Sequence, residues 1–398
     1  MRGMGTFQIA NGNVIFPDEI ANDCTLLIKN GRIAEILRGA VFPDVPVLDA
    51  EGVFVSPGFV DVHCHGGAGF DFMDGTEEAF SSIENFHLLH GTTSMLATTV
   101  TACDEELAAF LAAFDRFCSE RNDRTIFRGV HLEGPFISTA QAGAQNAAFI
   151  KPFAKDVYKK IINEGKGRIK RWTAAPEIAG FADFFVCCAQ NRIDVSSGHT
   201  DATFGDIEYA VQNLGLRAVT HLYSSMNGVM RKNAYRTAGA VEAALYFDEI
   251  TAEIIADGIH LPPQLLRFVY KTKGADGLVL ITDASAAAGS RGGAARIGSA
   301  KNGSNVIVEN GVAFMPDRKS FAGSCATTDM LVRTMLQQTG ASLCEAVRMM
   351  TLNPAKAAGL NKDYGSIETG KMADILFFDQ NIEIKKIIVH GIEREDKA

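Results

Sequence analysis

Between residues 59 and 360, short apolar runs of strand length alternate with stretches of helical periodicity. Stretches such as 105–120 and 263–271 place apolar residues along one face of a helix. The intervals between the first run's end, His65, and the last run's end, Asp283, average about 31 residues, the size of one βα unit. Eight strands alternating with helices predict an α/β fold, a (β/α)₈ TIM barrel. The predicted strands are 59–65, 94–100, 128–133, 171–177, 194–199, 218–221, 252–260 and 278–283.

Both ends of the chain read as short β-strands. Residues 6–55 contain several such runs with Asn-Gly turn signals between them, and residues 375–390 contain more. Neither end is large enough to form a persuasive core alone. We therefore predict that the two ends combine into one small β-sandwich beside the barrel. The predicted domains are a composite sandwich of residues 1–58 and 361–398 and a barrel of residues 59–360.

Composition narrows the class of protein. Of the 398 residues, 47% are hydrophobic and 21% are charged, which is typical of a folded, soluble chain. A net charge of −9 and a pI near 5.5 disfavour nucleic acid or an anionic membrane as partner. The eight cysteines form no C-x-x-C motif, and no apolar stretch has the length of a signal or membrane segment. We expect a cytoplasmic protein.

Residues of the kind that bind metals end most of the predicted barrel strands. Side chains alternate along a strand, so His63 and His65 should point to the same side, about 6–7 Å apart. The carboxyl ends of barrel strands meet at one rim, where active sites lie, and scattered core histidines have no reason to select those ends. The glycine-rich segment 289–296, after the eighth strand, is predicted to be a mobile loop beside this rim. The strand-end residues are His63, His65, His131, Glu133, His199, His221, His260 and Asp283.

Structural roles compete with metal binding at individual positions. His131 lies two residues before Glu133 and shares its face of the strand. At this position, support of a metal ligand or packing in the core competes with metal binding on at least equal terms. His87 and His90, spaced i, i+3, are predicted to lie on a helix surface. Glu133 and Asp283 follow apolar runs, where a carboxylate is costly to bury unless it is paired or metal-bound. Mixed histidine and carboxylate ligands at an open site suit Zn²⁺, Fe²⁺, Mn²⁺ or Co²⁺.

The strand-end motifs together resemble one known family. They are H-C-H at 63–65, H-L-E-G-P-F at 131–136, S-G-H-T at 197–200, T-H-L-Y at 220–223, A-D-G-I-H at 256–260 and I-T-D-A at 281–284. In this combination the chain resembles the N-acetylglucosamine-6-phosphate deacetylases of the amidohydrolase superfamily, over nearly its whole length. The segment 353–375, which begins N-P-A-K-A-A-G-L, is similar to the superfamily's return into its terminal β-sandwich.

The resemblance implies a metal site of Glu133, His199 and His221. His63 and His65 would supply a second metal position that some members of the family lack. One or two divalent ions per chain are therefore expected, with Zn²⁺ first and Fe²⁺, Mn²⁺ or Co²⁺ as the other candidates. Many binuclear hydrolases on this barrel bridge two metals with a carbamylated lysine, but no lysine ends the fourth predicted strand here. Glu133 is then the natural anionic ligand and possible bridge.

The resemblance also implies roles around the substrate. Asp283 would be the general base and acid, and His260 would contact the sugar or its phosphate. Phe321, Ala322 and Gly323 would line the sugar site.

The chain departs from the family at several expected sugar contacts. Gln145-Asn146 stands where the family commonly has H-N, and Ser224-Ser225-Met226 stands where it has N-A-M. The usual histidine contact to the substrate is therefore replaced by Gln145. The substrate-binding positions expected in these two stretches are Ala144, Gln145, Ser224 and Ser225.

The family's arginine in an R-E-P-G context is also absent. The stretch 230–239 instead reads M-R-K-N-A-Y-R-T-A-G and follows the sixth strand, so its loop should lie on the rim. A solvated basic turn is the alternative interpretation. A guanidinium can bind two phosphate oxygens at once, so we expect Arg236, and after it Arg231, to bind a phosphate.

These observations predict a metal-dependent hydrolase that deacetylates an N-acetyl amino-sugar 6-phosphate, N-acetylglucosamine 6-phosphate first, giving acetate and a free amine. The family assembles as dimers, and we expect a homodimer. One alternative is another amidohydrolase, acting on N-acetylgalactosamine 6-phosphate or a different N-acyl substrate. A second is a non-catalytic sugar-phosphate-binding barrel, which would have no need of the proton shuttle expected at Asp283.

Overall fold

The computed structural model describes residues 5–122, 124–290 and 293–394, and its largest element is the predicted barrel. Eight parallel strands follow one another around it in chain order, each paired with its neighbour. Between the last strand and the first, the Asp283 N–H donates to the His63 carbonyl oxygen at 2.8 Å, which links the two at the rim. The TIM-barrel prediction is confirmed. The strands are β8 (Phe59–Cys64), β11 (Thr92–Thr98), β12 (Phe127–Glu133), β13 (Ile169–Ala174), β14 (Asp194–Ser197), β15 (Ala218–Val219), β18 (Thr251–Ile254) and β19 (Leu278–Leu280).

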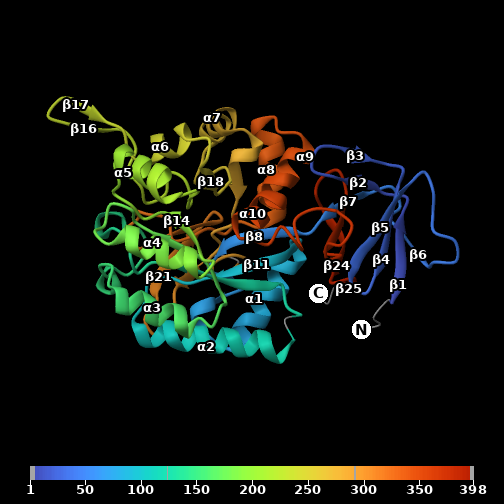
Figure 1. Cartoon of the computed structure of the whole chain (residues 1–398), viewed down its shortest axis with the longest axis horizontal. Helices are drawn as coiled ribbons and strands as arrows, with labels where there is room; N and C mark the ends of the chain where they lie inside the picture. Colours follow the sequence, from blue (N-terminus) through green and yellow to red (C-terminus); the bar gives the residue numbers. More distant parts are fainter. Residues whose placement is uncertain (1–4, 123, 291–292, 395–398) are drawn as a thin grey trace.

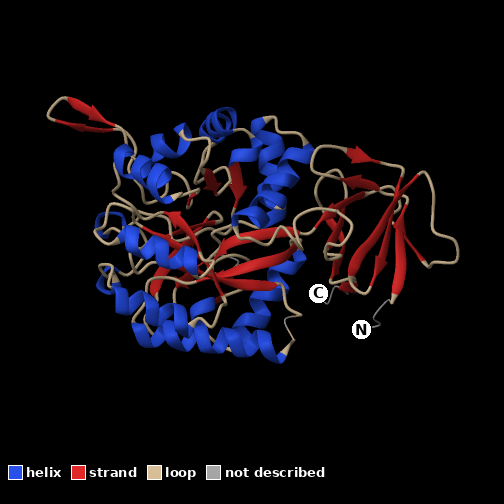
Figure 2. Ribbon diagram, in the orientation of Figure 1, coloured by secondary structure: helices blue, strands red, loops and turns tan. Residues whose placement is uncertain are grey.

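Helices cover the outside of the barrel (Figure 2). They begin where the sequence supplies caps: the Thr76 hydroxyl accepts from the Ala79 N–H at the start of α1, and Ser342 caps α9 likewise. Their apolar faces pack on the strands, so the barrel wall is buried on both sides. The helices are α1 (Glu77–Leu89), α2 (Asp104–Glu120), α3 (Lys155–Glu164), α4 (Phe181–Gln190), α5 (Phe204–Tyr209), α6 (Ala240–Tyr246), α7 (Pro263–Lys273), α8 (Thr328–Thr339), α9 (Leu343–Met350) and α10 (Leu352–Ala357). Short single-turn helices are η1 (Phe72–Asp74), η2 (Thr139–Gln141), η3 (Ala147–Phe149), η4 (Ala210–Leu214) and η5 (Ala275–Gly277).

A small β-domain made from both chain ends lies beside the barrel (Figure 1). The N-terminal strand β7 pairs with β23 from the C-terminal end, with Leu376 opposite Ser56. Apolar residues from both ends, such as Val55 and Phe377, share its core. Its sheets have the orders β25-β24-β23-β7-β2-β3 and β5-β4-β1-β6. The strands are β1 (Thr6–Ala10), β2 (Asn13–Ile15), β3 (Ile20–Ala21), β4 (Cys24–Lys29), β5 (Arg32–Arg38), β6 (Val47–Asp49), β7 (Phe54–Pro57), β23 (Ile375–Phe378), β24 (Ile384–Val389) and β25 (Ile392–Arg394).

Two structures beside the rim were not predicted. Part of the glycine-rich segment expected to be a mobile loop is strand β20, which pairs with β21, and β21 pairs with β22. The prediction was wrong there because the small residues of β20, which are typical of a loop, pair in a β-ladder with the β-branched residues of β21. Residues 291–292 of that segment lie outside the described residues. The two structures are an antiparallel insert of β20 (Gly293–Ile297), β21 (Ser304–Glu309) and β22 (Val312–Phe314), and a hairpin of β16 (Met230–Lys232) and β17 (Tyr235–Thr237).

One further small ribbon, β9 (Gly66–Gly67) and β10 (Phe70–Asp71), follows the first barrel strand and leads into η1. Among the residues described, no helix has both the length and the apolar character needed to span a membrane.

Candidate active site

The histidine pair at the end of β8, His63 within it and His65 just after it, projects to one side of the strand, as its alternation predicts. The Nε2 atoms of His63 and His65 are 3.4 Å apart, and both rings are buried. Glu133, at the end of β12, faces both: its Oε1 lies 3.4 Å from His63 Nε2 and its Oε2 lies 3.3 Å from His65 Nε2. One carboxylate therefore meets the two imidazoles of the first strand.

A second pair of histidines meets the same carboxylate. Glu133 Oε1 lies 3.0 Å from His221 Nε2 and 3.2 Å from His199 Nε2, and these two nitrogens are 3.2 Å apart. His199 and His221 come just after β14 and β15, with φ of 47° and 29°. This left-handed backbone ends each strand, and both rings face Glu133. Both pairs of histidines thus share Glu133.

The donor set fits a divalent metal ion. Tetrahedral coordination with bonds of about 2.0–2.1 Å places ligand atoms about 3.3 Å from one another. The measured separations within each group are 3.0–3.4 Å. Imidazole nitrogen and carboxylate oxygen are ligands that Zn²⁺ and its neighbours accept. The two groups that could hold an ion are His63, His65 and Glu133, and Glu133, His199 and His221.

Asp283 completes the cluster from the end of the eighth strand. Its Oδ1 lies 3.2 Å from His65 Nε2 and 3.4 Å from His63 Nε2. Its own φ is 48°, and its backbone N–H is held by the His63 carbonyl. The aspartate side chain is thus fixed beside the first histidine pair, and it also lines the open pocket.

The charges of the cluster stabilise one another. Burial alone would raise the pKa of Glu133, but His199 and His63 outweigh it and hold that pKa well below its ordinary value. Burial would lower the pKa of His221, but its bond to Glu133 raises it to about 9. For Asp283, His63 and His65 overcome burial and lower the pKa. A bound divalent ion would take the place of the proton that His221 holds.

Beneath the cluster, a buried ion pair supports His63. Its Nδ1 lies 3.4 Å from Oε2 of Glu253, on β18, while Glu253 Oε1 lies 2.6 Å from Nη2 of the fully buried Arg171. Burial would raise the pKa of Glu253, but Arg171 and His63 lower it. A carboxylate on the far nitrogen fixes the ring and turns Nε2 toward the cluster. We did not predict this pair; a glutamate inside the apolar run 251–256 was the available signal.

Two other histidines take part in packing. His131 is fully buried and its Nε2 lies 2.8 Å from Thr173 Oγ1, so it supports the barrel interior and belongs to neither ligand group. The prediction that His87 lies on a helix surface was wrong. It is fully buried, and its Nε2 donates to the Gly66 carbonyl oxygen at 2.9 Å, because α1 turns that face toward the ribbon after β8.

A pocket of about 250 Å³ opens onto the ligand cluster. It contains most of the predicted site residues, from six of the eight barrel units and from the insert. His63 is behind this surface, and Ala322 is fully buried beside it. The predicted residues that line the pocket are His65, Glu133, Ala144, Gln145, His199, His221, Ser224, Ser225, His260, Asp283, Phe321 and Gly323.

His260 is held in a defined orientation within this pocket. Its Nδ1 lies 2.7 Å from Asp257 Oδ2, and Phe321 packs on its ring with 4.3 Å between centroids. Asp257 accepts the Nδ1–H, which in the neutral ring leaves Nε2 as an acceptor. His260 is thus oriented to receive a hydrogen bond from a ligand.

Gln145 is held by both ends of its amide. Its Oε1 accepts from the Thr101 N–H at 2.6 Å, and its Nε2 donates to Glu133 Oε2 at 2.5 Å. The backbone donor fixes which end of the amide faces the carboxylate. Gln145 therefore positions Glu133, and only one of its N–H bonds is left for a substrate.

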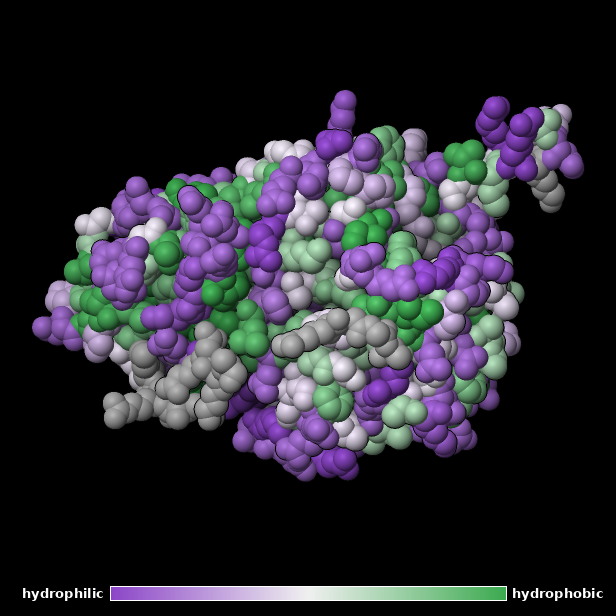
Figure 3. Space-filling model, turned by 180° about the vertical axis from the view of Figure 1, so that it is seen from behind, coloured by the Kyte–Doolittle hydropathy of each residue, from purple (hydrophilic) through white to green (hydrophobic). Residues whose placement is uncertain are grey.

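The structure does not bring Arg231 and Arg236 to the pocket. They lie opposite each other on the β16–β17 hairpin, which projects away from the barrel (Figure 1; seen from behind in Figure 3). Both are exposed, and so are Val229 and Tyr235, at 61% and 80%. Within one chain these arginines are not part of the site.

Several residues that line the pocket were not predicted. Tyr223 follows His221 in the quoted T-H-L-Y motif, and its φ of 75° marks it as part of the same irregular turn. The insert and the turn after it, which no sequence motif predicted, contribute Ile297, Lys319 and Ser320 to the pocket.

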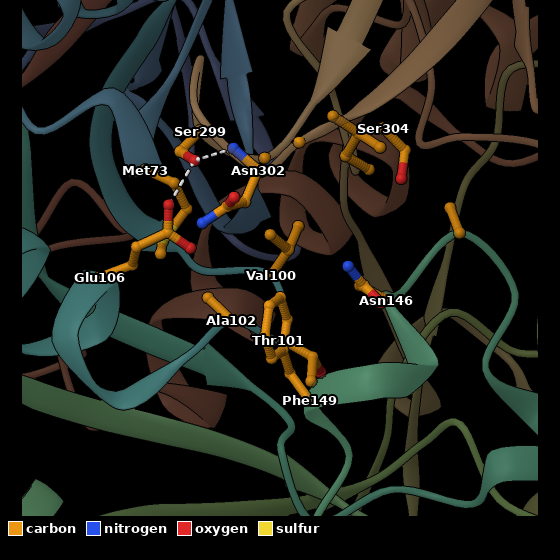
Figure 4. Close-up of a pocket in the computed structure, with 14 residues that line it drawn as sticks. Met73, Val100, Thr101, Ala102, Glu106, Asn146, Phe149, Ser299, Asn302 and Ser304 are labelled. Carbon is orange, nitrogen blue, oxygen red and sulfur yellow. Dashed lines mark hydrogen bonds between the residues drawn. The ribbon is translucent and has the colours of Figure 1, made fainter.

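The insert is anchored to the barrel rim around a second, smaller cavity of about 20 Å³ (Figure 4). Ser299 donates to Glu106 Oε1 at 2.7 Å, and the backbone N–H of Gly298 donates to Asp71 Oδ2 at 2.7 Å. This cavity shares Ala144 with the main pocket. These bonds fix the insert as one wall of the site.

The chain matches known proteins over most of its length. Residues 54–393 match the model of the amidohydrolase family. The chain is 35% identical over 364 residues to the N-acetylglucosamine-6-phosphate deacetylase of Lysinibacillus sphaericus, covering 92% of this chain and 91% of the relative. It is 32% identical over 394 residues to the enzyme of that name from Bos taurus, with 96% and 90% covered.

Solved structures agree with these matches. A mutant N-acetyl-D-glucosamine-6-phosphate deacetylase from Mycobacterium smegmatis, in complex with N-acetyl-D-glucosamine-6-phosphate, superimposes with a TM-score of 0.88 at 28% identity, covering 98% of this chain and 99% of that one. The N-acetylglucosamine-6-phosphate deacetylase from Pasteurella multocida gives 0.90 at 26% identity, with 98% and 100% covered. The chain therefore belongs to the amidohydrolase family and, within it, to the N-acetylglucosamine-6-phosphate deacetylases.

Proposed function

We propose that the chain hydrolyses the acetamide of N-acetylglucosamine 6-phosphate to glucosamine 6-phosphate and acetate. The observation that carries the proposal is Glu133, shared between two histidine pairs with Asp283 beside them, in a pocket of a chain related to enzymes of that name. A divalent ion in this position supplies a Lewis acid that acidifies water and polarises an amide carbonyl. Zn²⁺ is the ion that we propose.

Protein side chains supply the rest of the chemistry. Asp283, whose pKa is lowered, is ionised near neutral pH and accepts the proton of the attacking water. It then delivers that proton to the leaving nitrogen, because an amine anion is too basic to leave unprotonated. His260 Nε2 accepts a hydrogen bond from a sugar hydroxyl, and Phe321 packs beside the His260 ring. Glu133, His199 and His221 form the first metal site, and His63 and His65 complete the second.

The neighbouring backbone and side chains would bind the rest of the sugar. Ala144, Ser224, Ser225 and Gly323 line the pocket around the ligand cluster and offer small polar or backbone contacts. The side-chain amide of Gln145 serves mainly to position Glu133. For Arg231 or Arg236 to contact a phosphate, the hairpin would have to move to the pocket of its own chain or reach the pocket of a second subunit.

We also propose that the enzyme is a cytoplasmic homodimer. The exposed apolar side chains of Val229 and Tyr235, on a hairpin that stands clear of the barrel, are consistent with a surface that a second subunit covers. Sedimentation velocity of the wild type and of Tyr235→Ser tests this; a wild-type monomer at micromolar concentration would contradict it.

The second candidate substrate is N-acetylgalactosamine 6-phosphate. An Escherichia coli N-acetylgalactosamine-6-phosphate deacetylase is 28% identical over 90% of this chain. The test of the function is acetate release from the two N-acetyl hexosamine 6-phosphates and their unphosphorylated forms. The proposal predicts the highest kcat/KM for N-acetylglucosamine 6-phosphate. If metal-loaded enzyme released acetate from neither phosphorylated sugar, the proposed function would be overturned.

A further inference from the structure

A row of charged side chains crosses the interior of the barrel beneath the ligand cluster. Arg171 on β13 reaches Glu253 on β18, with 2.6 Å between Nη2 and Oε1, although β14 and β15 separate these two strands in the sheet. Nη1 of Arg171 also donates to Oδ2 of Asp194, on the neighbouring strand β14. The other carboxylate oxygen of Glu253, Oε2, lies 3.4 Å from His63 Nδ1. The row therefore ends on a candidate metal ligand.

This ion pair is not what the stability of a barrel interior requires. Arg171 and His63 are fully buried, and Glu253 is 1% exposed. Two buried charges lose their hydration, and apolar side chains of similar volume often serve the stability of a core at least as well. The contact with His63 offers a different reason for the pair, which is support of a ligand.

The four candidate ligand histidines differ in what their Nδ1 atoms contact. Nδ1 of His199 lies 2.8 Å from the Gln141 carbonyl oxygen, a neutral acceptor. Within the described part of the chain, Nδ1 of His65 and Nδ1 of His221 have no hydrogen-bond partner. Among the described residues, His63 is thus the one of these four whose Nδ1 faces a carboxylate. The two metal groups are supported unequally from behind.

A carboxylate on the far nitrogen strengthens an imidazole as a metal ligand. It orients the ring and raises its basicity, and loss of such a partner costs about 10- to 100-fold in metal affinity. Arg171 holds the Glu253 carboxylate in place before an ion binds. The benefit falls on the group that contains His63, together with His65 and Glu133, because the other group does not contain His63.

We propose that the Arg171–Glu253 pair sets the affinity of the second metal position through His63 and leaves the first position unaffected. This inference rests on the two metal positions of the proposed function. Arg171 and Glu253 are positioning residues, since neither belongs to a ligand group or lines the pocket. The pair thereby decides whether the enzyme holds one ion or two at a given metal concentration.

The test compares two carboxylates that both contact Arg171, of which one contacts His63. Metal-free protein is titrated with Zn²⁺ against a chromophoric chelator, which gives the affinity of each binding step. Glu253→Gln should weaken the second step about 10- to 100-fold and leave the first unchanged. Asp194→Asn is the matched control, because it also takes one carboxylate from Arg171, and it should leave both steps unchanged. Equal weakening in both variants, or none in Glu253→Gln, would overturn the inference.

Two further variants separate support of His63 from a general effect on the fold. Arg171→Met/Glu253→Leu replaces the pair by apolar side chains, a change that buried ion pairs often tolerate, and should weaken the second step to the same degree. It decides the question if circular dichroism shows that Glu253→Gln does not fold. In a His63→Asn background, Glu253→Gln should leave the affinity of the remaining ion unchanged, because the residue through which it acts is gone. A further loss there would overturn the inference.

Metal binding and activity together distinguish this inference from the proposed function. If the wild type binds two ions and Glu253→Gln loses the second, but the wild type releases no acetate, the function is wrong and the inference stands. If acetate is released but Glu253→Gln binds both ions as tightly as the wild type, the function stands and the inference is wrong. A wild type that binds fewer than two ions overturns the inference whatever its activity.

Discussion

The rim of the barrel and the β-domain at its side are built on opposite principles. The rim gathers buried carboxylates and imidazoles, and some of these side chains, such as His199, His221 and Asp283, combine burial with a positive φ, which costs about 1–3 kcal/mol each. The β-domain is built from ordinary ladders, with apolar residues such as Val55 and Phe377 buried between its sheets. Buried ionisable side chains with a positive φ thus lie where chemistry is expected, whereas in the β-domain positive φ occurs in connections between strands, as at Asn11 and Asn30. Substitutions in the two regions should therefore affect different measurements.

The largest effect is expected where the two histidine pairs meet. Glu133→Gln removes the shared negative ligand and should lose bound metal, with turnover reduced about 10³-fold or more. Elemental analysis and acetate release measure the two losses. Glu84→Gln, which replaces a half-buried carboxylate on the outer helix α1, is the control and should keep both. Full metal content in Glu133→Gln would refute the ligand assignment.

Asp283→Asn should come next. Asparagine tolerates the positive φ of this position and is nearly isosteric, so the fold and the metal should be retained. Without a group that can accept and return the proton, kcat should fall about 10²–10⁴-fold. Steady-state kinetics on metal-loaded protein gives the answer. A variant that keeps more than about a tenth of wild-type kcat would exclude the role of proton shuttle.

His63→Asn should have a smaller effect, because the group of Glu133, His199 and His221 remains intact. We expect one ion to stay bound and turnover to fall about 10- to 100-fold, less than in Glu133→Gln. Metal stoichiometry and kcat are measured together. Complete loss of metal in this variant would mean that the two groups do not bind ions independently.

The smallest effect on chemistry is expected in the β-domain. Phe377 is buried in the sheet that joins both chain ends, so Phe377→Ala should lower the free energy of unfolding by about 3–5 kcal/mol. Metal content and kcat per folded molecule should be unchanged. Denaturant titration followed by circular dichroism measures the first, and kinetics on the folded fraction measures the second. A proportionate loss of kcat per folded molecule would break the proposed separation of the two regions.

The barrel could be predicted because its signals are local. Apolar runs of strand length recur at the spacing of one βα unit, and the ligand-type residues occur at the strand ends where the fold exposes them. The joining of the two chain ends could be predicted only because neither has a sufficient core alone. The insert was missed because β20 consists largely of small residues and completes its ladder only with β21.

Within the candidate site, prediction from the sequence was also limited for physical reasons. Proximity of Glu133 to both histidine pairs follows from barrel geometry, but the support of His63 by Glu253, which Arg171 holds in turn, requires three strands to be placed together. The reach of the hairpin arginines could not be judged from their position after the sixth strand, since a two-stranded ribbon carries them away. Lys319 stands in a turn with no motif, and only the folded insert brings it to the pocket.

Metal titration of the chelated enzyme tests the central claim most directly. Protein stripped of metal should release no acetate from N-acetylglucosamine 6-phosphate, and activity should return in proportion to added Zn²⁺ until one or two equivalents are bound. Glu133→Gln treated in the same way should neither bind the ion tightly nor recover. Full activity in the stripped wild-type enzyme, verified as metal-free by elemental analysis, would contradict the account.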